Sequence, residues 1–368
     1  MMDIILPYAH MALAFVLILS VIVFIHEFGH YLVARLCGVR ITDFSIGFGR
    51  EIFGFHDRHG TRWKFSLLPL GGYVKMFGDA SEASTSKSEQ LNLMSEAERK
   101  VSFHYQPLYK KAFIVTAGPL FNFILTIGIF TFFVFTNGLE TTEPLVGDVI
   151  AESPAAAAGL QSGDRILQVD GKKVARFTDI PLLIITNVGK PVRLLYERDG
   201  EPKEVMLTPQ IIEESDGLGN ISKRPLIGIK SMRMTFEDVG VVRAVGESVK
   251  KTWDLSLLTF DYIGQLVTGQ RTPDELKGPI GIAKMSGQAL EKGWMTVLWF
   301  MALLSANLGL INLFPIPPLD GGHLMYYMLQ AARGRPMAER YQEMGYRAGF
   351  ALILMLMAFT IYNDIRQF

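Results

Sequence analysis

Four long apolar stretches limit the folds that this chain can adopt. A helix that crosses the hydrocarbon core of a bilayer needs roughly 20 mostly apolar residues, with a range of about 17–25. Hydrophobic residues make up 49% of the sequence, which is typical of a membrane protein. The stretches that qualify lie near Ala9–Leu36, Ala112–Thr136, Trp294–Leu313 and Tyr346–Tyr362. We therefore predict a polytopic α-helical membrane protein with about four transmembrane helices.

Basic residues predict the orientation of these spans. The loop after the first span carries Arg and Lys residues from Arg35 to Lys111, and the loop before the fourth span is also basic. Short basic loops face the cytoplasm, so both termini and residues 137–293 are predicted to be extracytoplasmic. In a bacterium, the chain would then be a multi-pass protein of the inner membrane, with the lipid bilayer as its surroundings. The formal net charge of zero favours no nucleic-acid partner.

The segments between the spans predict further structures. Residues 41–79 alternate strand-forming side chains with glycines, which indicates a membrane-associated antiparallel β-loop. An amphipathic pattern from Phe236 to Leu266 and a turn-rich segment at Lys277–Ala283 are predicted to lie at the outer membrane surface. The predicted order is a first transmembrane helix at 1–40, a β-loop at 41–79, a cytoplasmic linker at 80–111, a second transmembrane helix at 112–136, an extracytoplasmic α/β domain at 143–230, the amphipathic helix and turn at 231–293, and the third and fourth transmembrane helices at 294–323 and 346–362.

Ionisable residues inside the first span predict a functional site. The sequence there is His26-Glu27-Phe28-Gly29-His30, and charged groups within a span are costly and usually functional. Residues four apart lie on one face of a helix, about 6 Å apart along its axis, so both imidazoles can bind one zinc ion. Glu27 is placed to act as general base for the attacking water. The alternative is that these polar residues only line a seam between helices.

A catalytic zinc ion needs a third protein ligand, and Asp320 is the best candidate. Three prolines between residues 315 and 318 stop the third span from continuing as a regular helix just before Asp320. In the predicted orientation the first and third spans run in the same direction, so His26 and Asp320 fall at the same depth. A helix cap is the alternative role for Asp320. Because Cys37 is the only cysteine, a zinc site made of several thiolates is excluded.

Three asparagines and one histidine are weaker candidates for the same site. Asn307 and Asn312 in the third span could bind a substrate backbone or stabilise an oxyanion, or they could tie helices together. Asn122, at the cytoplasmic end of the second span, could line the same cavity. His323 could support the ligands or could simply be an interfacial histidine.

Three motifs, HEFGH in the first span, GPLFNF in the second and NLFPIPPLDGGH in the third, closely resemble those of the site-2 protease family, and in particular of its bacterial RseP-like metalloproteases. The resemblance covers nearly the whole chain. It implies zinc bound by His26, His30 and Asp320, Glu27 as the catalytic base, and a membrane-reentrant β-loop at 41–79 that holds the substrate as an extended strand. It also implies single-span substrates already shortened by another protease, such as anti-sigma factors or remnant signal peptides.

The extracytoplasmic segment carries a second resemblance. Its stretch SPAAAAGLQSGDRILQVDG is similar to bacterial PDZ domains, although an unrelated sandwich-like insertion is the alternative. PDZ domains bind extended peptides by adding a strand to a sheet edge. The best-known RseP-like proteins carry two PDZ domains, whereas this chain has room for one.

The predicted function is therefore zinc-dependent intramembrane proteolysis within a regulated cascade. One alternative is a proteolytically inactive membrane scaffold that binds partners through its PDZ-like domain; the intact HExxH motif argues against it. The other is a metal transporter, but the sequence shows none of the internal repeats of spans that transporters often have.

Overall fold

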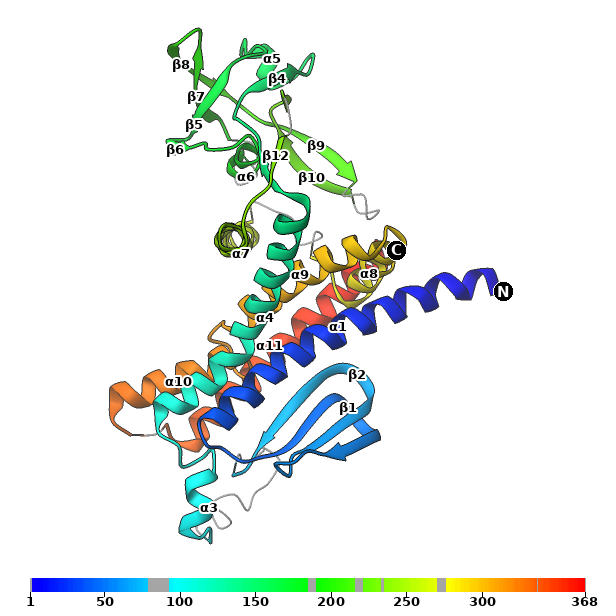
Figure 1. The fold of residues 1–368 in the computed structure, drawn as a ribbon, viewed down its shortest axis with the longest axis vertical. Coiled ribbons are helices and arrows are strands. Elements are labelled where there is room, and N and C mark those ends of the chain that lie inside the picture. The colour runs from blue at the N-terminus through cyan, green and yellow to red at the C-terminus, as the bar shows by residue number, and fades with distance from the viewer. Residues whose placement is uncertain are drawn as a thin grey trace. The chain divides into compact units, whose positions relative to one another are not determined.

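The computed structural model describes residues 2–78, 93–184, 190–215, 221–232, 235–269, 276–335 and 337–367. The chain forms two compact units, one made of Met1–Ile129 with Leu276–Phe368 and the other of Phe130–Glu275 (Figure 1). Helix α4 (Leu108–Asn137) begins in the first unit and ends in the second. The second unit is therefore an insertion in the sequence of the first.

Four helices have the length and apolar composition of membrane spans. They are Ala9–Leu36 within α1 (Met2–Leu36), α4, α9 (Trp294–Asn312) and α11 (Glu339–Arg366). They lie where the four spans are predicted, but α4 and α11 begin four and seven residues earlier. Hydrogen bonding within a helix continues past the apolar stretch, so polar residues such as Lys110 and Glu343 extend both helices.

Strands β1 (Ile41–His56) and β2 (Arg62–Met76) pair as an antiparallel sheet at the predicted β-loop. Both strands bend, so the sheet has four segments in the order 51–56, 62–66, 41–46 and 72–76. Segments 51–56 and 72–76 are therefore its edges. The sheet lies along α1 (Figure 1), because Phe44 is buried in a cluster with Tyr31 and Ala34 of that helix.

The predicted cytoplasmic linker, residues 80–111, is partly helical. Residues 79–92 lie outside the described residues. Ser95 and Glu98 form a reciprocal capping box that begins α3 (Glu96–Val101), and α4 has already begun at Leu108. Two stretches of the predicted linker are therefore helical, and in α3 local capping stabilises helix in a polar sequence.

The segment Lys277–Ala283 does not form the predicted turn. Gly278 caps α8 (Pro279–Glu291), with Pro279 at the first helical position. Proline is suited to that position because its fixed φ is helical and its missing N–H would have no partner there. Helix α8 buries Ala289 in one cluster with Ile18 and Ile22 of α1 and with Phe300 of α9.

The second unit contains a small α/β domain, here called the inserted domain (residues 145–231). One core, which includes Val146, Ile166 and Leu194, holds it together. Its main sheet has the order β6 (Lys172–Lys173), β5 (Arg165–Val169), β7 (Val192–Arg198) and β8 (Glu201–Leu207). The other elements are β4 (Val146–Val149) paired with β11 (Ile229–Ser231), β9 (Gln210–Ser215) paired with β10 (Ile221–Leu226), and helices α5 (Pro154–Ala157) and α6 (Asp179–Ile184).

The amphipathic helix begins later than predicted. Phe236 lies in β12 (Thr235–Glu237), which pairs with β3 (Leu139–Thr141), and α7 runs from Val241 to Val267. Pairing with β3 satisfies the backbone of residues 235–237 in an extended form, which overrides their helical pattern. Helix α7 exposes a row of apolar side chains at helical spacing: Val242, Val245, Val249, Trp253, Leu257 and Phe260.

Candidate metal centre

Helix α1 brings the two predicted histidine ligands together. His26 and His30 are one turn apart on the same face, and their Nε2 atoms are 3.3 Å from each other. The side chains are largely buried, with 9% and 8% of each residue exposed. Two imidazole nitrogens thus face a common point inside a candidate membrane span.

Asp320 reaches this point because the chain breaks between two helices. Helix α9 ends at Asn312, and α10 (Asp320–Arg333) begins at Asp320 itself. Gly321 and Gly322 make the tight connection possible, since a Cβ at Gly321 would overlap the carbonyl oxygens of Leu313 and Phe314. The break predicted from the prolines is therefore present, and it turns the first residue of α10 toward α1.

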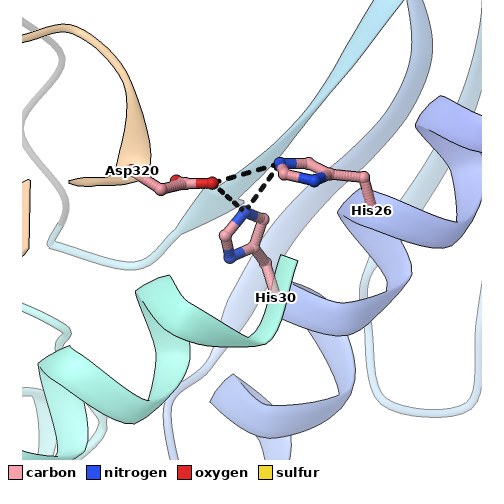
Figure 2. A group of neighbouring side chains, drawn as sticks. All are labelled: His26, His30 and Asp320. Atoms are coloured by element: carbon pink, nitrogen blue, oxygen red, sulfur yellow. Dashed lines mark hydrogen bonds and ion pairs between the residues drawn. The ribbon is translucent and has the colours of Figure 1, made fainter. Parts of the chain in front are cut away.

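The three ligand atoms have the spacing of a tetrahedral zinc site. Oδ2 of Asp320 lies 3.2 Å from Nε2 of His26 and 3.5 Å from Nε2 of His30. Figure 2 shows the three side chains pointing toward one another. Two atoms that each lie about 2.0–2.1 Å from a tetrahedral ion are about 3.3–3.4 Å apart. Among the described residues, His26, His30 and Asp320 form the group whose ligand atoms are close enough together to hold a metal ion.

The other ring nitrogens determine which form the histidines take. Nδ1 of His30 lies 2.8 Å from the carbonyl oxygen of Ile114 and can only donate to it. Nδ1 of His26 lies 3.1 Å from the side-chain amide of Asn122, whose opposite oxygen is buried without a partner. Oxygen and nitrogen of an amide are interchangeable by a turn of 180°, which lets Oδ1 accept from Nδ1–H of His26. Both neutral imidazoles then present an Nε2 lone pair to the centre.

The protonation of the two histidines decides whether a cation fits between His26, His30 and Asp320. With both Nε2 atoms as acceptors, Oδ2 of Asp320 has no donor among the described residues, and it is buried. Three converging lone pairs repel one another unless a positive ion lies between them. A divalent ion with two nitrogen ligands and one oxygen ligand satisfies all three, and this ligand set suits zinc.

Glu27 lies beside the two histidines of α1 and also beside the β-sheet. Its carboxylate lies close to the backbone of Val74, in the edge segment 72–76. The close approach requires a glycine at position 72, since a Cβ there would lie 3.0 Å from Cγ of Glu27. The sheet edge and the predicted catalytic base are therefore neighbours.

Asn122 is held in place by α9 as well as by its own helix. Its backbone carbonyl accepts hydrogen bonds from the hydroxyls of Thr126, at 3.0 Å, and of Ser305, at 2.9 Å. Thr126 also donates to the carbonyl of Ala302, at 3.0 Å. These contacts join α4 to α9 and fix the position from which the Asn122 side chain meets His26.

The Asn122 contact leads to a prediction about zinc affinity. Asn122→Leu keeps a similar volume but removes the acceptor for Nδ1–H of His26, so we expect zinc to bind about 10–100-fold more weakly. Asn122→Asp keeps an acceptor and is the matched control. Zinc titration with a competing chelator measures both variants. Equal affinity of the Leu variant and the wild type would contradict this role for Asn122.

Gly118 of α4 lies directly against both histidine rings. A Cβ at this position would overlap Nε2 of His30 and would lie 2.8 Å from Cε1 of His26. Gly29, between the two histidines, is equally restricted, since its Cβ would overlap the carbonyl oxygen of Ala117. The two glycines allow α1 and α4 to cross closely enough for the contacts of His30 and His26 with α4.

Gly118→Ala is therefore expected to weaken zinc binding by at least about 100-fold, because the added methyl group displaces the ligand atoms. The intrinsic preference of a helix for Ala over Gly acts in the opposite direction, by about 1 kcal/mol. Gly128→Ala in the same helix is the control, since a Cβ there meets nothing within 4 Å. Zinc content and thermal stability, measured side by side, separate the two effects. If both variants kept full zinc content, the rings would not be confined as described.

The remaining predicted residues lie outside the ligand group. Asn307 and Asn312 are in α9, and their role stays a prediction. His323 lies one turn after Asp320 and contacts the hydroxyl of Tyr346 in α11, at 3.1 Å from Nδ1. Gly118 and the carbonyl of Ile114 were not predicted. Ile114 contributes only backbone, which carries no sequence signal, and Gly118 is recognisable only once the crossing of the helices is known.

Comparison with known proteins identifies the family of this chain. The model of the family described as peptidase family M50 matches residues 14–356, a range that includes all three candidate ligands. The chain belongs to peptidase family M50. It is a zinc metalloprotease of the site-2 type.

The M50 relatives match over almost their whole length. A protein of Mesorhizobium japonicum named as a zinc metalloprotease is 44% identical over 359 residues, which is 95% of this chain and 97% of the relative. Metalloprotease MmpA of Caulobacter vibrioides is 36% identical over 381 residues, covering 97% and 96% of the two chains. A solved PDZ domain of an SdrC-like protein from Listeria monocytogenes is 24% identical, covers 25% of this chain and 90% of that one, and has a TM-score of 0.20.

Proposed function

We propose that this M50 protein hydrolyses peptide bonds of membrane-spanning segments within the bilayer. The position of the ligand group carries the proposal. His26 lies ten residues, or about 15 Å, from the end of α1 at Leu36, inside a segment of mean hydropathy 2.4. A hydrocarbon core is about 30 Å thick, so a metal centre at this depth meets substrates that are themselves in the membrane.

Each residue of the site has a proposed part in the reaction. His26, His30 and Asp320 hold the metal, while Asn122 and Ile114 orient the two rings. Zinc, when bound, polarises a scissile carbonyl and acidifies the attacking water. Glu27 takes the proton from that water and passes it to the leaving amide nitrogen. Asn307 and Asn312 of α9 are proposed to bind the substrate backbone.

The β-sheet is proposed to receive the substrate as an extended strand. Carbonyl groups of a transmembrane helix are hydrogen-bonded and shielded, so the helix must unwind before hydrolysis. The edge segment 72–76, beside Glu27, can replace the lost hydrogen bonds by strand addition. Entry of this sheet into the membrane is supported by the apolar side chains that it exposes, among them Phe48, Ile52, Phe53, Phe55, Leu67 and Leu68.

The proposed substrates are single spans already shortened by another protease, such as anti-sigma factors or remnant signal peptides, in regulated intramembrane proteolysis. The protein is proposed to lie in the bacterial inner membrane, with both termini and a PDZ-like inserted domain outside and the centre toward the cytoplasm. The exposed apolar row on α7 supports a position for that helix on the outer membrane surface.

Cleavage of single-span reporters by the full-length protein in detergent tests the proposal. Mass spectrometry of the products is expected to locate the cut inside the span, and a zinc chelator is expected to abolish it until zinc is restored. Zinc-loaded protein that binds a broad panel of reporters without cleaving any would instead support the inactive scaffold. Cuts confined to the soluble flanks would contradict the intramembrane location.

A further inference from the structure

A second polar contact joins α1 to the β-sheet, one turn beyond Glu27. The hydroxyl of Tyr31 donates to Oδ2 of Asp57, at 2.8 Å. Asp57 lies in the turn between β1 and β2, directly after the edge segment 51–56. Glu27 and Tyr31 are four residues apart and therefore share one face of α1. This face contacts the sheet at one edge, segment 72–76, and at Asp57, in the turn that follows the other edge segment.

The two oxygens of Asp57 have separate tasks. Oδ1 accepts from the backbone N–H groups of His59 and Thr61, at 2.8 and 2.9 Å, and so shapes the turn. Oδ2 accepts from Tyr31 and from Nε1 of Trp63, at 3.1 Å. These hydrogen bonds outweigh the desolvation of the carboxyl group and lower the pKa of Asp57 to about 2. Asp57 is therefore ionised at neutral pH and makes charge-assisted bonds.

The Tyr31 side chain also lies near that of Thr61. The other contacts between Tyr31 and the sheet are aromatic. The ring of Tyr31 meets that of Trp63 edge-on, with centroids 5.2 Å apart, and that of Phe44, at 5.7 Å. Trp63 and Phe44 stack on each other at 4.2 Å. Apolar burial holds surfaces together but is non-directional, so it resists sliding of the sheet along α1 less than a hydrogen bond of fixed geometry does.

We propose that the Tyr31–Asp57 hydrogen bond is a positioning contact that holds the β-sheet in register along α1, so that segment 72–76 stays beside Glu27. Tyr31 and Asp57 are then positioning residues, because they touch neither the metal nor the bond that is cleaved. The inference rests on the proposed strand addition of substrates to this edge. Loss of the contact lets the sheet, and any strand added to it, shift relative to the metal centre.

Tyr31→Phe tests the contact, because it removes one hydroxyl and keeps the ring among its aromatic neighbours. We expect KM for a single-span reporter to rise about five- to tenfold, in line with the net contribution of one typical hydrogen bond, with zinc content unchanged. We also expect cleavage to spread to peptide bonds beside the main site. Asp57→Asn keeps an oxygen for the turn but places an NH₂ group opposite Tyr31 and Trp63. It should show at least the same defect, and the double variant should be no worse than Asp57→Asn alone.

Tyr109→Phe is the matched control, since Tyr109 is an exposed tyrosine in the first turn of α4, outside the sheet and the metal centre. Hydrogen–deuterium exchange of the full-length protein gives a readout that needs no activity. Tyr31→Phe is expected to speed exchange about five- to tenfold at residues 72–76. The part of α1 that carries His26 and His30 is expected to stay protected. This arm remains decisive even if no reporter is cleaved and the proposed function fails.

Three results would overturn the inference. One is a Tyr31→Phe variant whose KM, cleavage pattern and exchange rates equal those of the wild type. Another is additive effects of Tyr31→Phe and Asp57→Asn, which would mean that they act separately. The third is loss of zinc in Tyr31→Phe, which would mean that Tyr31 acts through His30 beside it in the sequence.

Discussion

Glu27→Gln is expected to lower kcat for cleavage of a single-span reporter by about 10²–10⁴-fold, the usual contribution of a general base. Gln has the shape of Glu and keeps an oxygen beside the backbone of Val74, so the fold and the sheet edge should be unchanged. A neutral amide cannot take a proton from water. Since Glu27 is outside the ligand group, zinc content should remain near one ion per chain.

Three measurements on the purified variant decide this prediction: kcat, zinc content and thermal stability. Glu291→Gln at the exposed end of α8 makes the same chemical change away from the centre and should cleave like the wild type. Full activity of Glu27→Gln would show that another group takes the proton. Loss of zinc together with activity would show that Glu27 acts as a ligand and not as the base.

Asp320→Ala is expected to remove zinc almost completely and to abolish cleavage. The substitution leaves two imidazoles and removes the carboxylate that lies 3.2 and 3.5 Å from them, whereas catalytic zinc sites keep three protein ligands. Glu27 still lies beside the histidines, but it is assigned to the attacking water and does not replace the lost ligand. Atomic absorption of the dialysed protein gives the zinc content directly.

The position of Asp320 at the start of α10 calls for a control. A carboxylate in the first turn of a helix also interacts favourably with the helix dipole, by about 0.3–1 kcal/mol. Glu339→Ala removes an acidic residue from the first turn of α11 and reproduces that loss without touching the centre. It should keep its zinc. Zinc retained by Asp320→Ala, with activity, would rule out Asp320 as the third ligand.

The spans and the histidine pair were predictable because both depend on properties that are local in the sequence. Apolar length decides whether a helix can span a bilayer, and helical geometry places residues 26 and 30 on one face whatever surrounds them. Where the local pattern competed with other contacts, the prediction failed. Phe236 pairs with Glu140 in a strand instead of starting α7, and Gly278-Pro279 begins α8 instead of a turn.

Asp320 is an intermediate case. The prolines before it predict a break in the helix, and the orientation of the spans places it at the depth of His26. Its contact with the histidines at 3.2 and 3.5 Å depends on the backbone approach that Gly321 and Gly322 permit. Sequence predicts the depth of Asp320, and packing decides the direction in which its carboxylate points.

By itself, the sequence determined that this chain has four apolar stretches long enough to span a membrane. It also determined that one of them carries two histidines on one helix face with a glutamate between, because periodicity and hydrophobicity are local properties of the sequence. Only the tertiary structure decided what surrounds that pair. The contacts of Gly118 with the rings, of Asn122 and Ile114 with the two Nδ1 atoms, and of Tyr31 with Asp57 join residues from separate elements. They depend on how closely helices and sheet pack, and close packing is a property of the folded chain rather than of any one segment.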